Sequence, residues 1–289
     1  MSDVTKELKV IFENISELSA RRDLVLEESD ICFSLLAEYL TKNTDLISSK
    51  NEIFELIRKY CANANASQCM SFLREITRNL SFPDSFLSLA EDNFEIFSKD
   101  KPAVISYVKN NYNDAAYLRF SELFSNAKVS YGASFDDICE NVYNGISDYC
   151  ILPIESVDAG KLFSFYSLID KYDLKIFAVS DIDEGHTEKR TRYALLSRGN
   201  LIFSQQVEKA YFEFSVIHDD SYDLTDILNA AKACSLGLYR IDTIPVYYDD
   251  LAFKFYHVFE LSGNDLIPFL IYIELRYPQF KPLGYYILV

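Results

Sequence analysis

Groups that could hold a small ligand stand at the end of one apolar segment. The stretch "DYCILPIES" is apolar up to Pro153 and Ile154, then places the carboxylate of Glu155, and Gly160 follows five residues later. Parallel strands of α/β folds present their carboxyl ends to ligands, so a carboxylate at such an end is typical of the rim of a binding site. The alternative is an ordinary strand end, in which Glu155 accepts hydrogen bonds from the backbone N–H groups that open the next helix.

Thr191 and Arg192 open a second apolar segment, "TRYALLSR". Their position predicts the start of a strand that carries an exposed arginine. The sequence contains no Ser-His-Asp, P-loop or Rossmann pattern that would indicate another chemistry.

The charge balance excludes some classes of partner. The 289-residue chain has 28 Lys and Arg against 44 Asp and Glu, which gives a net charge of −16. An anionic surface repels nucleic acid and acidic lipid head groups, and no Lys/Arg cluster offsets it locally. We therefore expect neither nucleic acid nor a membrane as a partner. An enzyme for an anionic substrate would need a locally basic pocket.

Cysteine and histidine usage argues against a metal centre. The cysteines form no C-x-x-C pair and the three histidines are scattered, so we predict reduced thiols, no metal and no cofactor. The start "MSDVTKELKVIFENI" is amphipathic with acidic residues, unlike a signal peptide, and no apolar run approaches the ~20 residues of a membrane span. We expect a soluble, cytoplasmic protein. The cysteines are Cys32, Cys61, Cys69, Cys139, Cys150 and Cys234.

Three segments of different periodicity must position these groups. Residues 1–97 show helical spacing almost throughout, which predicts an all-α segment of three or four helices. Residues 98–206 alternate apolar strands with helical stretches in the order β-α-β-α-β-α-β, followed by one more strand. This order predicts one parallel α/β lobe with right-handed crossovers. The expected strands are 103–108, 127–132, 148–154, 174–182 and 191–198, and the expected helices are 112–124, 135–142 and 160–170.

The last segment, residues 207–289, has the order of a ferredoxin-like unit. A strand, a helix, two strands, a helix and a strand follow one another. This βαββαβ order is that of the ferredoxin-like motif. The chain is therefore predicted to combine α/β and α+β domains. The expected bounds of these six elements are 211–218, 224–237, 238–248, 253–261, 264–278 and 281–289.

The order of the last two segments, and several of their residues, resemble prephenate dehydratase followed by an ACT regulatory domain. Family members read Pro-Ile-Glu-Asn-Ser-x-x-Gly at a strand end, and Pro153, Ile154, Glu155 and Gly160 keep that spacing. The stretch "NNYNDAAYLRF" lies where the family has a Gly-Thr/Ala-Tyr-Ser sequence that opens a helix. "GLYRIDTIPV" and "PLGYY" resemble segments of the ACT domain. The resemblance covers residues 102–289 and implies half of a two-lobe, periplasmic-binding-like fold.

The resemblance also implies roles for individual residues. Thr191-Arg192-Tyr193 is similar to the family's Thr-Arg-Phe, whose threonine is implicated in catalysis, so Thr191 and Arg192 would be the catalytic groups. The ACT counterpart of Glu-Ser-Arg-Pro would place an effector against Asp242, Thr243 and Pro245, with the first two holding an ammonium group. Substrate-binding residues would be Glu155, Ser156, Gly160, Asn113 and Arg21.

Arg21 enters through a separate resemblance of the first segment. The stretch "ELSARRDLVLEESDI" is similar to the long first helix of the chorismate mutase domain that some family members carry, with its Arg-Arg-x-Leu. A mutase pocket also needs a lysine about three turns further on, and this chain has Cys32 or Phe33 there. An unrelated helical cap, with Arg21 and Arg22 as solvated charges, is the alternative.

Several departures from the family pattern predict impaired catalysis. The family has an entire second lobe between "KIFAVSDI" and Thr191, and here one short stretch connects them. Val157 stands where the family has a serine and can donate no side-chain hydrogen bond. Asn110 replaces a glycine that would let a ligand approach the backbone. Loss of hydroxide and carbon dioxide from prephenate requires donors from both walls of a cleft.

These departures lead to three hypotheses. The first is a degenerate prephenate dehydratase-like protein that has lost catalysis and binds or regulates, with prephenate or an amino acid as its ligand. The second is an active chorismate mutase/prephenate dehydratase that converts prephenate to phenylpyruvate with a remodelled site. The third is a ligand-independent assembly module. Because "IPFLIYIEL" is apolar on all sides and ACT domains commonly pair, we also expect a homodimer through the ACT or helical segment.

Overall fold

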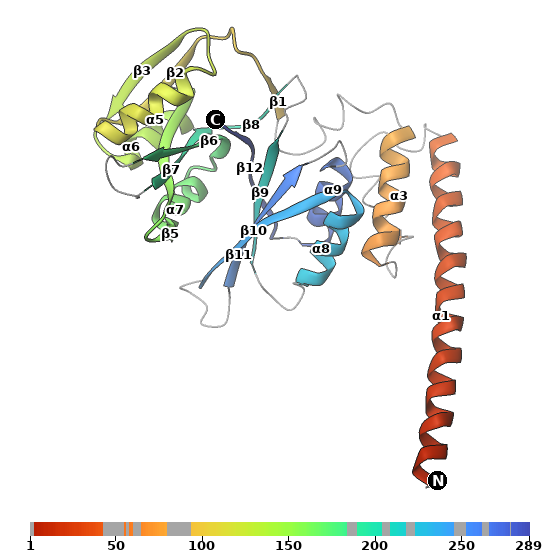
Figure 1. Ribbon diagram of the computed structural model, residues 1–289. Helices are drawn as coiled ribbons and strands as arrows, with labels where there is room; N and C mark the ends of the chain where they lie inside the picture. The colour runs from red at the N-terminus through yellow and green to blue at the C-terminus, as the bar shows by residue number, and fades with distance from the viewer. Residues whose placement is uncertain are drawn as a thin grey trace. The chain divides into compact units, whose positions relative to one another are not determined.

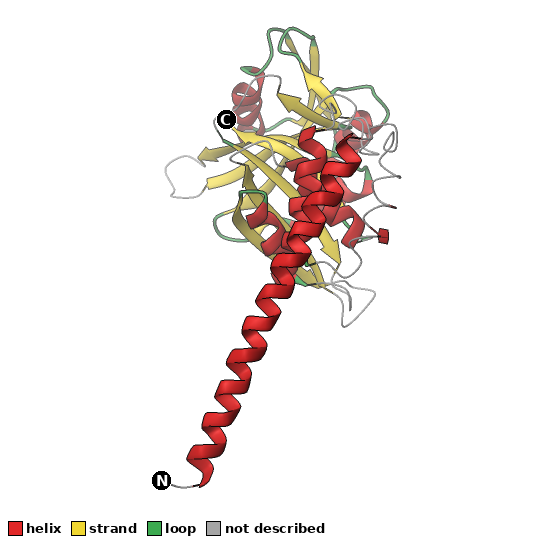
Figure 2. Cartoon of the chain, turned by 90° about the vertical axis from the view of Figure 1, so that its right-hand side faces the viewer, coloured by secondary structure: helices red, strands yellow, loops and turns green. Residues whose placement is uncertain are grey.

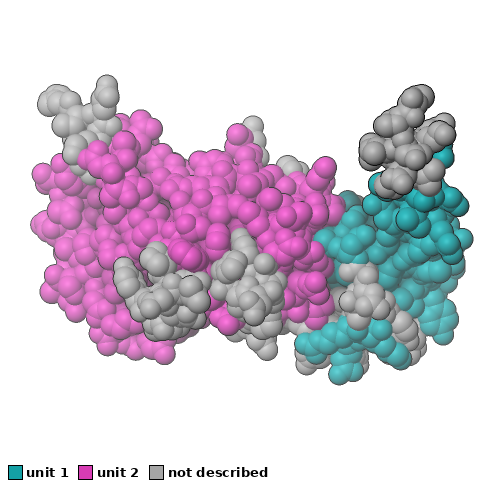
Figure 3. All heavy atoms as spheres, turned by 90° about the horizontal axis from the view of Figure 1, so that it is seen from below, with its two compact units in different colours: residues 1–82 teal, residues 83–289 magenta. Residues whose placement is uncertain are grey.

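The chain folds into two compact units, residues 1–82 and 83–289 (Figure 3). The computed structural model describes residues 3–42, 65–79, 94–183, 190–203, 209–217, 223–245, 253–261, 266–277 and 279–289, together with residues 55, 58 and 59.

In the first unit the structure gives bounds for one very long helix and one short helix, and residues 55, 58 and 59 between them are also helical. α1 (Asp3–Lys42) is a single helix of 40 residues, drawn as the longest helix in Figure 2. α3 (Ala66–Asn79) packs on its carboxyl-terminal half, where the ring of Phe33 lies 6.3 Å from that of Phe72 and Ala37 is buried. No helix in the described residues has the length and apolar character needed to cross a membrane.

The second unit is built on a mixed sheet of ten strands (Figure 1). The strands follow the order β10-β11-β9-β12-β6-β7-β4-β2-β3, and the short β5 pairs with β4. A separate parallel pair joins β1 to β8. The elements are β1 (Phe94–Phe97), β2 (Ala103–Val108), α5 (Asn111–Ser121), β3 (Ala127–Gly132), α6 (Phe135–Tyr143), β4 (Tyr149–Ser156), β5 (Gly160–Lys161), α7 (Phe163–Lys171), β6 (Lys175–Asp183), β7 (Arg190–Ser197), β8 (Asn200–Phe203), β9 (Ala210–Ile217), α8 (Leu224–Ala233), β10 (Leu236–Pro245), β11 (Phe253–Leu261), α9 (Leu266–Arg276) and β12 (Lys281–Leu288).

The first half of this unit, β2 to β7, differs from the predicted parallel lobe in one strand. β2, β3 and β4 are parallel neighbours, as expected, but β7 runs antiparallel between β4 and β6. β6 and β7 form a hairpin whose last pair is Asp183 with Arg190. The parallel expectation was wrong for β7 because a strand that returns directly from its neighbour must run antiparallel to it. Phe94–Phe97, at the end of the segment predicted to be all-α, is the strand β1.

The second half, β9 to β12, has the βαββαβ element order and the strand order β10-β11-β9-β12. Backbone pairing joins it to the first half. β12 pairs in parallel with β6, through Ile287 with Ala178 and Leu288 with Val179. Gly284 has φ +153°, and a Cβ atom at this position would overlap the backbone of Ile176. The sheet is continuous because glycine permits this close approach.

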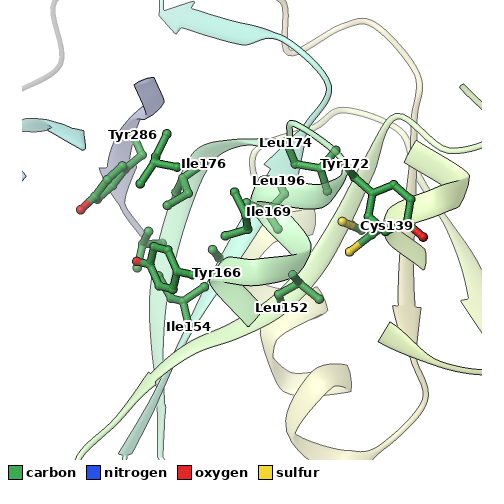
Figure 4. Close-up of a cluster of buried hydrophobic side chains, with 14 of the residues drawn as sticks. Cys139, Leu152, Ile154, Tyr166, Ile169, Tyr172, Leu174, Ile176, Leu196 and Tyr286 are labelled. Carbon is green, nitrogen blue, oxygen red and sulfur yellow. The ribbon is translucent and has the colours of Figure 1, made fainter. Parts of the chain in front are cut away.

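The core follows the two faces of the sheet. Along β4, Cys150, Leu152 and Ile154 belong to the cluster under α6 and α7, whereas Tyr149 and Ile151 belong to the cluster under α5. This alternation is the period of two that a strand buried on both faces requires. Figure 4 shows the α7 side of the core, in which Tyr286 from β12 packs with residues of the first half.

The βαββαβ half is also covered on both faces. α8 and α9 cover one face, where Phe214 lies 6.0 Å from Phe269. The other face packs on α7, and the ring of Tyr256 lies 5.2 Å from that of Tyr166. β9 is therefore buried along almost its whole length. Any charged residue on the α7 side of β9 needs a buried partner.

Candidate functional site

The turn after Pro-Ile-Glu returns the chain beside its own strand. Ser156 Oγ accepts a hydrogen bond from Ala159 N–H at 3.1 Å, and Gly160 adopts φ +67°, a left-handed conformation that glycine favours. β5 then pairs with β4, with Lys161 opposite Glu155. α7 begins only at Phe163 and its first turn has no side-chain cap. The predicted helix start at Gly160 and the predicted capping role of Glu155 are therefore wrong.

Glu155 lies in a row of charges that crosses three strands. Arg192 on β7 is the register partner of Glu155 on β4 and of Asp181 on β6. Its guanidinium donates to Asp181 at 2.7 and 3.1 Å and lies 3.6 Å from Glu155 Oε2. The hydrogen bonds to Asp181 raise the pKa of Arg192, so this residue stays charged at every physiological pH.

Arg240 on β10 connects this row to the βαββαβ half. One guanidinium nitrogen donates to Glu155 Oε1 at 2.5 Å, and another lies 2.8 Å from Asp242 Oδ1. Glu155 is thus bracketed by two arginines, one from each half of the unit. A carboxylate in this position stabilises both guanidinium groups and fixes the junction between the halves.

Lys161 continues the cluster into the interior. Its ammonium donates to Glu213 Oε1 at 2.5 Å and to the Tyr166 hydroxyl oxygen at 3.1 Å, and it lies 3.5 Å from Asp242 Oδ2. The Lys161 and Glu213 side chains are only 4% and 2% exposed. The ring centroids of Tyr166 and Tyr256 lie 4.2 and 4.8 Å from the ammonium nitrogen. We call the whole group the junction cluster: Glu155, Lys161, Asp181, Arg192, Glu213, Arg240 and Asp242.

Tyrosine hydroxyls complete the buried end of the junction cluster. Figure 4 shows Tyr166 and Tyr286 at the same end of the core, with their hydroxyls pointing the same way. The Tyr286 hydroxyl lies 3.4 Å from Glu213 Oε2. Burial, reinforced by the Glu213 carboxylate, raises the pKa of both phenols well above the usual value. Both therefore remain neutral hydrogen-bonding groups.

Three cations and four carboxylates make up the junction cluster, and each cation has carboxylate partners within the chain. The arrangement is well suited to holding two sheet segments together. It supplies no uncompensated positive charge for an anionic substrate.

Comparisons with known proteins identify the fold. A prephenate dehydratase from Streptococcus mutans matches with a TM-score of 0.52 and 16% identity, over 65% of this chain and 100% of that one. A prephenate dehydratase from Arthrobacter aurescens in complex with L-Phe matches with a TM-score of 0.50 and 14% identity, over 64% of this chain and 90% of that one. Solved prephenate dehydratases share this fold. GqqA, described as a novel type of quorum quenching acylase, matches with a TM-score of 0.51 and 16% identity, over 63% of this chain and 94% of that one. No family model and no curated protein sequence matches the chain.

The prephenate dehydratase-like fold separates the two predicted catalytic residues. Thr191 and Arg192 are neighbours on β7, so their side chains lie on opposite faces of the sheet. Thr191 is buried, and its register partners are Ser156 and Ile182. Ser156 itself holds the turn together. In this structure the side chains of Thr191 and Arg192 therefore point away from each other.

Of the remaining predicted residues, only Asp242 belongs to the junction cluster. Asn113 is buried in the first turn of α5, where its amide donates to Val108 O at 2.5 Å. Arg21 lies exposed on α1, in the other unit. Thr243 is exposed on β10, and the side chain of Pro245 lies outside the described residues. Asp242, predicted to hold an effector's ammonium group, faces the ammonium of Lys161 instead.

A small pocket lies at the opposite end of the strands. It is lined by Lys101 and by the first residues of β2 and β4, Ala103 and Tyr149. Asp148 in its wall accepts a hydrogen bond from Val104 N–H at 2.8 Å. None of the residues predicted from the sequence lines this pocket. Among the described residues, no group of three or more His, Cys, Asp or Glu is placed to hold a metal ion.

The sequence analysis missed four members of the junction cluster: Lys161, Asp181, Glu213 and Arg240. A signal existed for Glu213, because it is the only charged residue in "AYFEFSVI". A lone charge within a strand that is otherwise apolar on both faces predicts a buried partner. The sequence did not indicate which cation that partner was, since Lys161 lies 52 residues earlier.

Proposed function

We propose that this protein is a degenerate prephenate dehydratase-like protein that lacks dehydratase activity and acts as a binding or regulatory protein. In this proposal residues 207–289 are an ACT-like domain, supported by the strand order β10-β11-β9-β12. Its ligand would be prephenate or an amino acid. The fold alone does not choose an activity, since the similar GqqA is described as an acylase.

The observation that carries the proposal is the state of the candidate catalytic groups. Arg192 and Glu155 are engaged with each other and with Asp181 and Arg240, and Thr191 lies on the other face of β7. Dehydration of a dicarboxylate needs donors that are free to bind the substrate as charge develops. Here the donors are already bonded to side chains of the same chain.

The β6–β7 hairpin gives independent support. Asp183 and Arg190 pair directly, so six residues connect the two strands at the point where the family would insert a second lobe. Six residues span at most ~20 Å and cannot form a domain. The hairpin therefore supplies no second lobe that could enclose a transition state from this side of the sheet.

An enzyme assay tests the proposal. Purified protein is incubated with prephenate, and phenylpyruvate formation is measured for the wild-type chain and for Thr191→Ala. We expect no formation above the uncatalysed rate from either, since loss of one preorganised donor typically lowers the rate ~100-fold and several are engaged here. Turnover that disappears in Thr191→Ala would instead establish the active dehydratase. Shifts in melting temperature with prephenate, phenylalanine or tyrosine separate a binding protein from a ligand-independent assembly module.

A further inference from the structure

The ammonium group of Lys161 occupies a closed cage. Two carboxylates, Glu213 from β9 and Asp242 from β10, supply negative charge at 2.5 and 3.5 Å from the nitrogen. The aromatic rings of Tyr166 and Tyr256 lie 4.2 and 4.8 Å away, a distance at which ring faces attract cations. Carboxylates and ring faces around a single nitrogen are the chemistry of an ammonium-binding site.

The walls of the cage come from both halves of the second unit. Lys161 and Tyr166 belong to β5 and α7, whereas Glu213, Asp242 and Tyr256 belong to β9, β10 and β11. The ammonium therefore bridges the halves from the inside. Without it, the nearly inaccessible carboxylate of Glu213 would remain buried without a cation, which is strongly destabilising.

We propose that Lys161 acts as a tethered ligand of this cage, and that the cage, once vacated, binds a free primary alkylammonium ion. The tether places the ammonium at a high effective concentration, so free amines do not displace it from the wild-type protein. An amino acid is therefore excluded from Asp242 in the intact chain by the chain's own lysine. The inference concerns stability and binding, and it holds whether or not the protein has dehydratase activity.

Chemical rescue tests the proposal. Lys161→Ala removes the part of the side chain that n-propylammonium reproduces, and Lys161→Met fills the same space with an apolar group. Thermal melts of full-length wild type and both variants are recorded with increasing n-propylammonium chloride, with sodium chloride and 1-propanol as controls for ionic strength and apolar size. We expect both variants to melt on the order of 10 °C below wild type.

Only Lys161→Ala should regain melting temperature with n-propylammonium, and this gain should saturate at millimolar concentrations. Neither 1-propanol nor sodium chloride should produce the gain, and the melting temperature of wild type should not change with n-propylammonium. The proposal is overturned if Lys161→Met recovers equally, if 1-propanol or sodium chloride is as effective, or if Lys161→Ala melts like wild type. If Lys161→Ala does not fold alone, the soluble yield after refolding with and without n-propylammonium replaces the melt. A higher yield then supports the proposal, and an unchanged yield overturns it.

Discussion

At the scale of single residues, His257 gives the protein a pH-dependent stability. Its side chain is 0% exposed on β11 and stacks on Phe214 with ring centroids 4.8 Å apart. Burial lowers the pKa of His257 to about 4. Between that value and ~6.5 the unfolded chain binds a proton that the folded chain does not, so stability rises with pH through this window and levels off above it.

The first prediction follows from this difference. Lowering the pH from ~6.5 to ~4 should cost the wild type up to about 3 kcal/mol through His257 alone. His257→Phe keeps an aromatic ring against Phe214 and removes the titration. Urea melts across this pH range should therefore show that the free energy of unfolding falls less on acidification in the variant than in wild type. The carboxylates contribute equally in both proteins. Identical pH dependence would show that His257 is already protonated, or reached by solvent, in the folded state.

The residue scale also shows how far sequence reasoning reached. Glu155 was selected from the strand-end pattern, and Arg192 and Asp242 from the family resemblance. The structure places all three in the junction cluster. Their partners were not predictable in the same way. Arg240 reaches Glu155 across 85 residues, and only the joining of the two halves of the sheet brings them together. The roles expected from the family resemblance remain predictions.

At the scale of elements, strand and helix positions in residues 98–289 agreed closely with the periodicity. Residues 103–108, 127–132 and 253–261 are strands with the bounds that were predicted. The direction of β7 and the pairing of β12 with β6 were not predicted, because alternation of apolar residues fixes which face is buried and does not identify the neighbouring strand. The close approach of β12 to β6 depends on one glycine.

The second prediction tests that glycine. Gly284→Ala should destabilise the protein by ~3 kcal/mol or more, because its Cβ would overlap the backbone of Ile176 at a φ of +153°. Gly237→Ala in β10 is the matched control, since its Cβ would meet Glu260 at an ordinary distance of 3.9 Å. Urea unfolding midpoints provide the measurement. Equal, small effects from both substitutions would show that β12 and β6 do not approach this closely.

At the scale of the whole molecule, the reason for expecting a homodimer changes. We had expected the apolar helix 264–278 to remain partly uncovered, but Phe269, Ile271, Tyr272 and Ile273 of α9 are all buried. Large apolar side chains are exposed on α1 instead, on the part of the helix that precedes its contact with α3. Leu18 is 65% exposed, and Ile15 and Val25 are also exposed. Apolar side chains that lie together on one uncovered helix face are typical of an interface.

The last prediction is that two copies associate through α1. Ile15, Leu18 and Val25 follow one another at intervals of three and seven residues, so they line one face of the helix, and a second copy offers the same stripe. Light scattering at micromolar concentration should give twice the monomer mass of 33.3 kDa.

Leu18→Glu should weaken association at least ~10-fold, because each interface would then bury two carboxylates without partners. Ser16→Glu, on the opposite side of the helix, is the matched control and should leave the dimer intact. Added salt should strengthen association by screening the net charge of −16 on each copy. A monomeric wild type, or equal loss from both substitutions, would exclude this face of α1 as the interface.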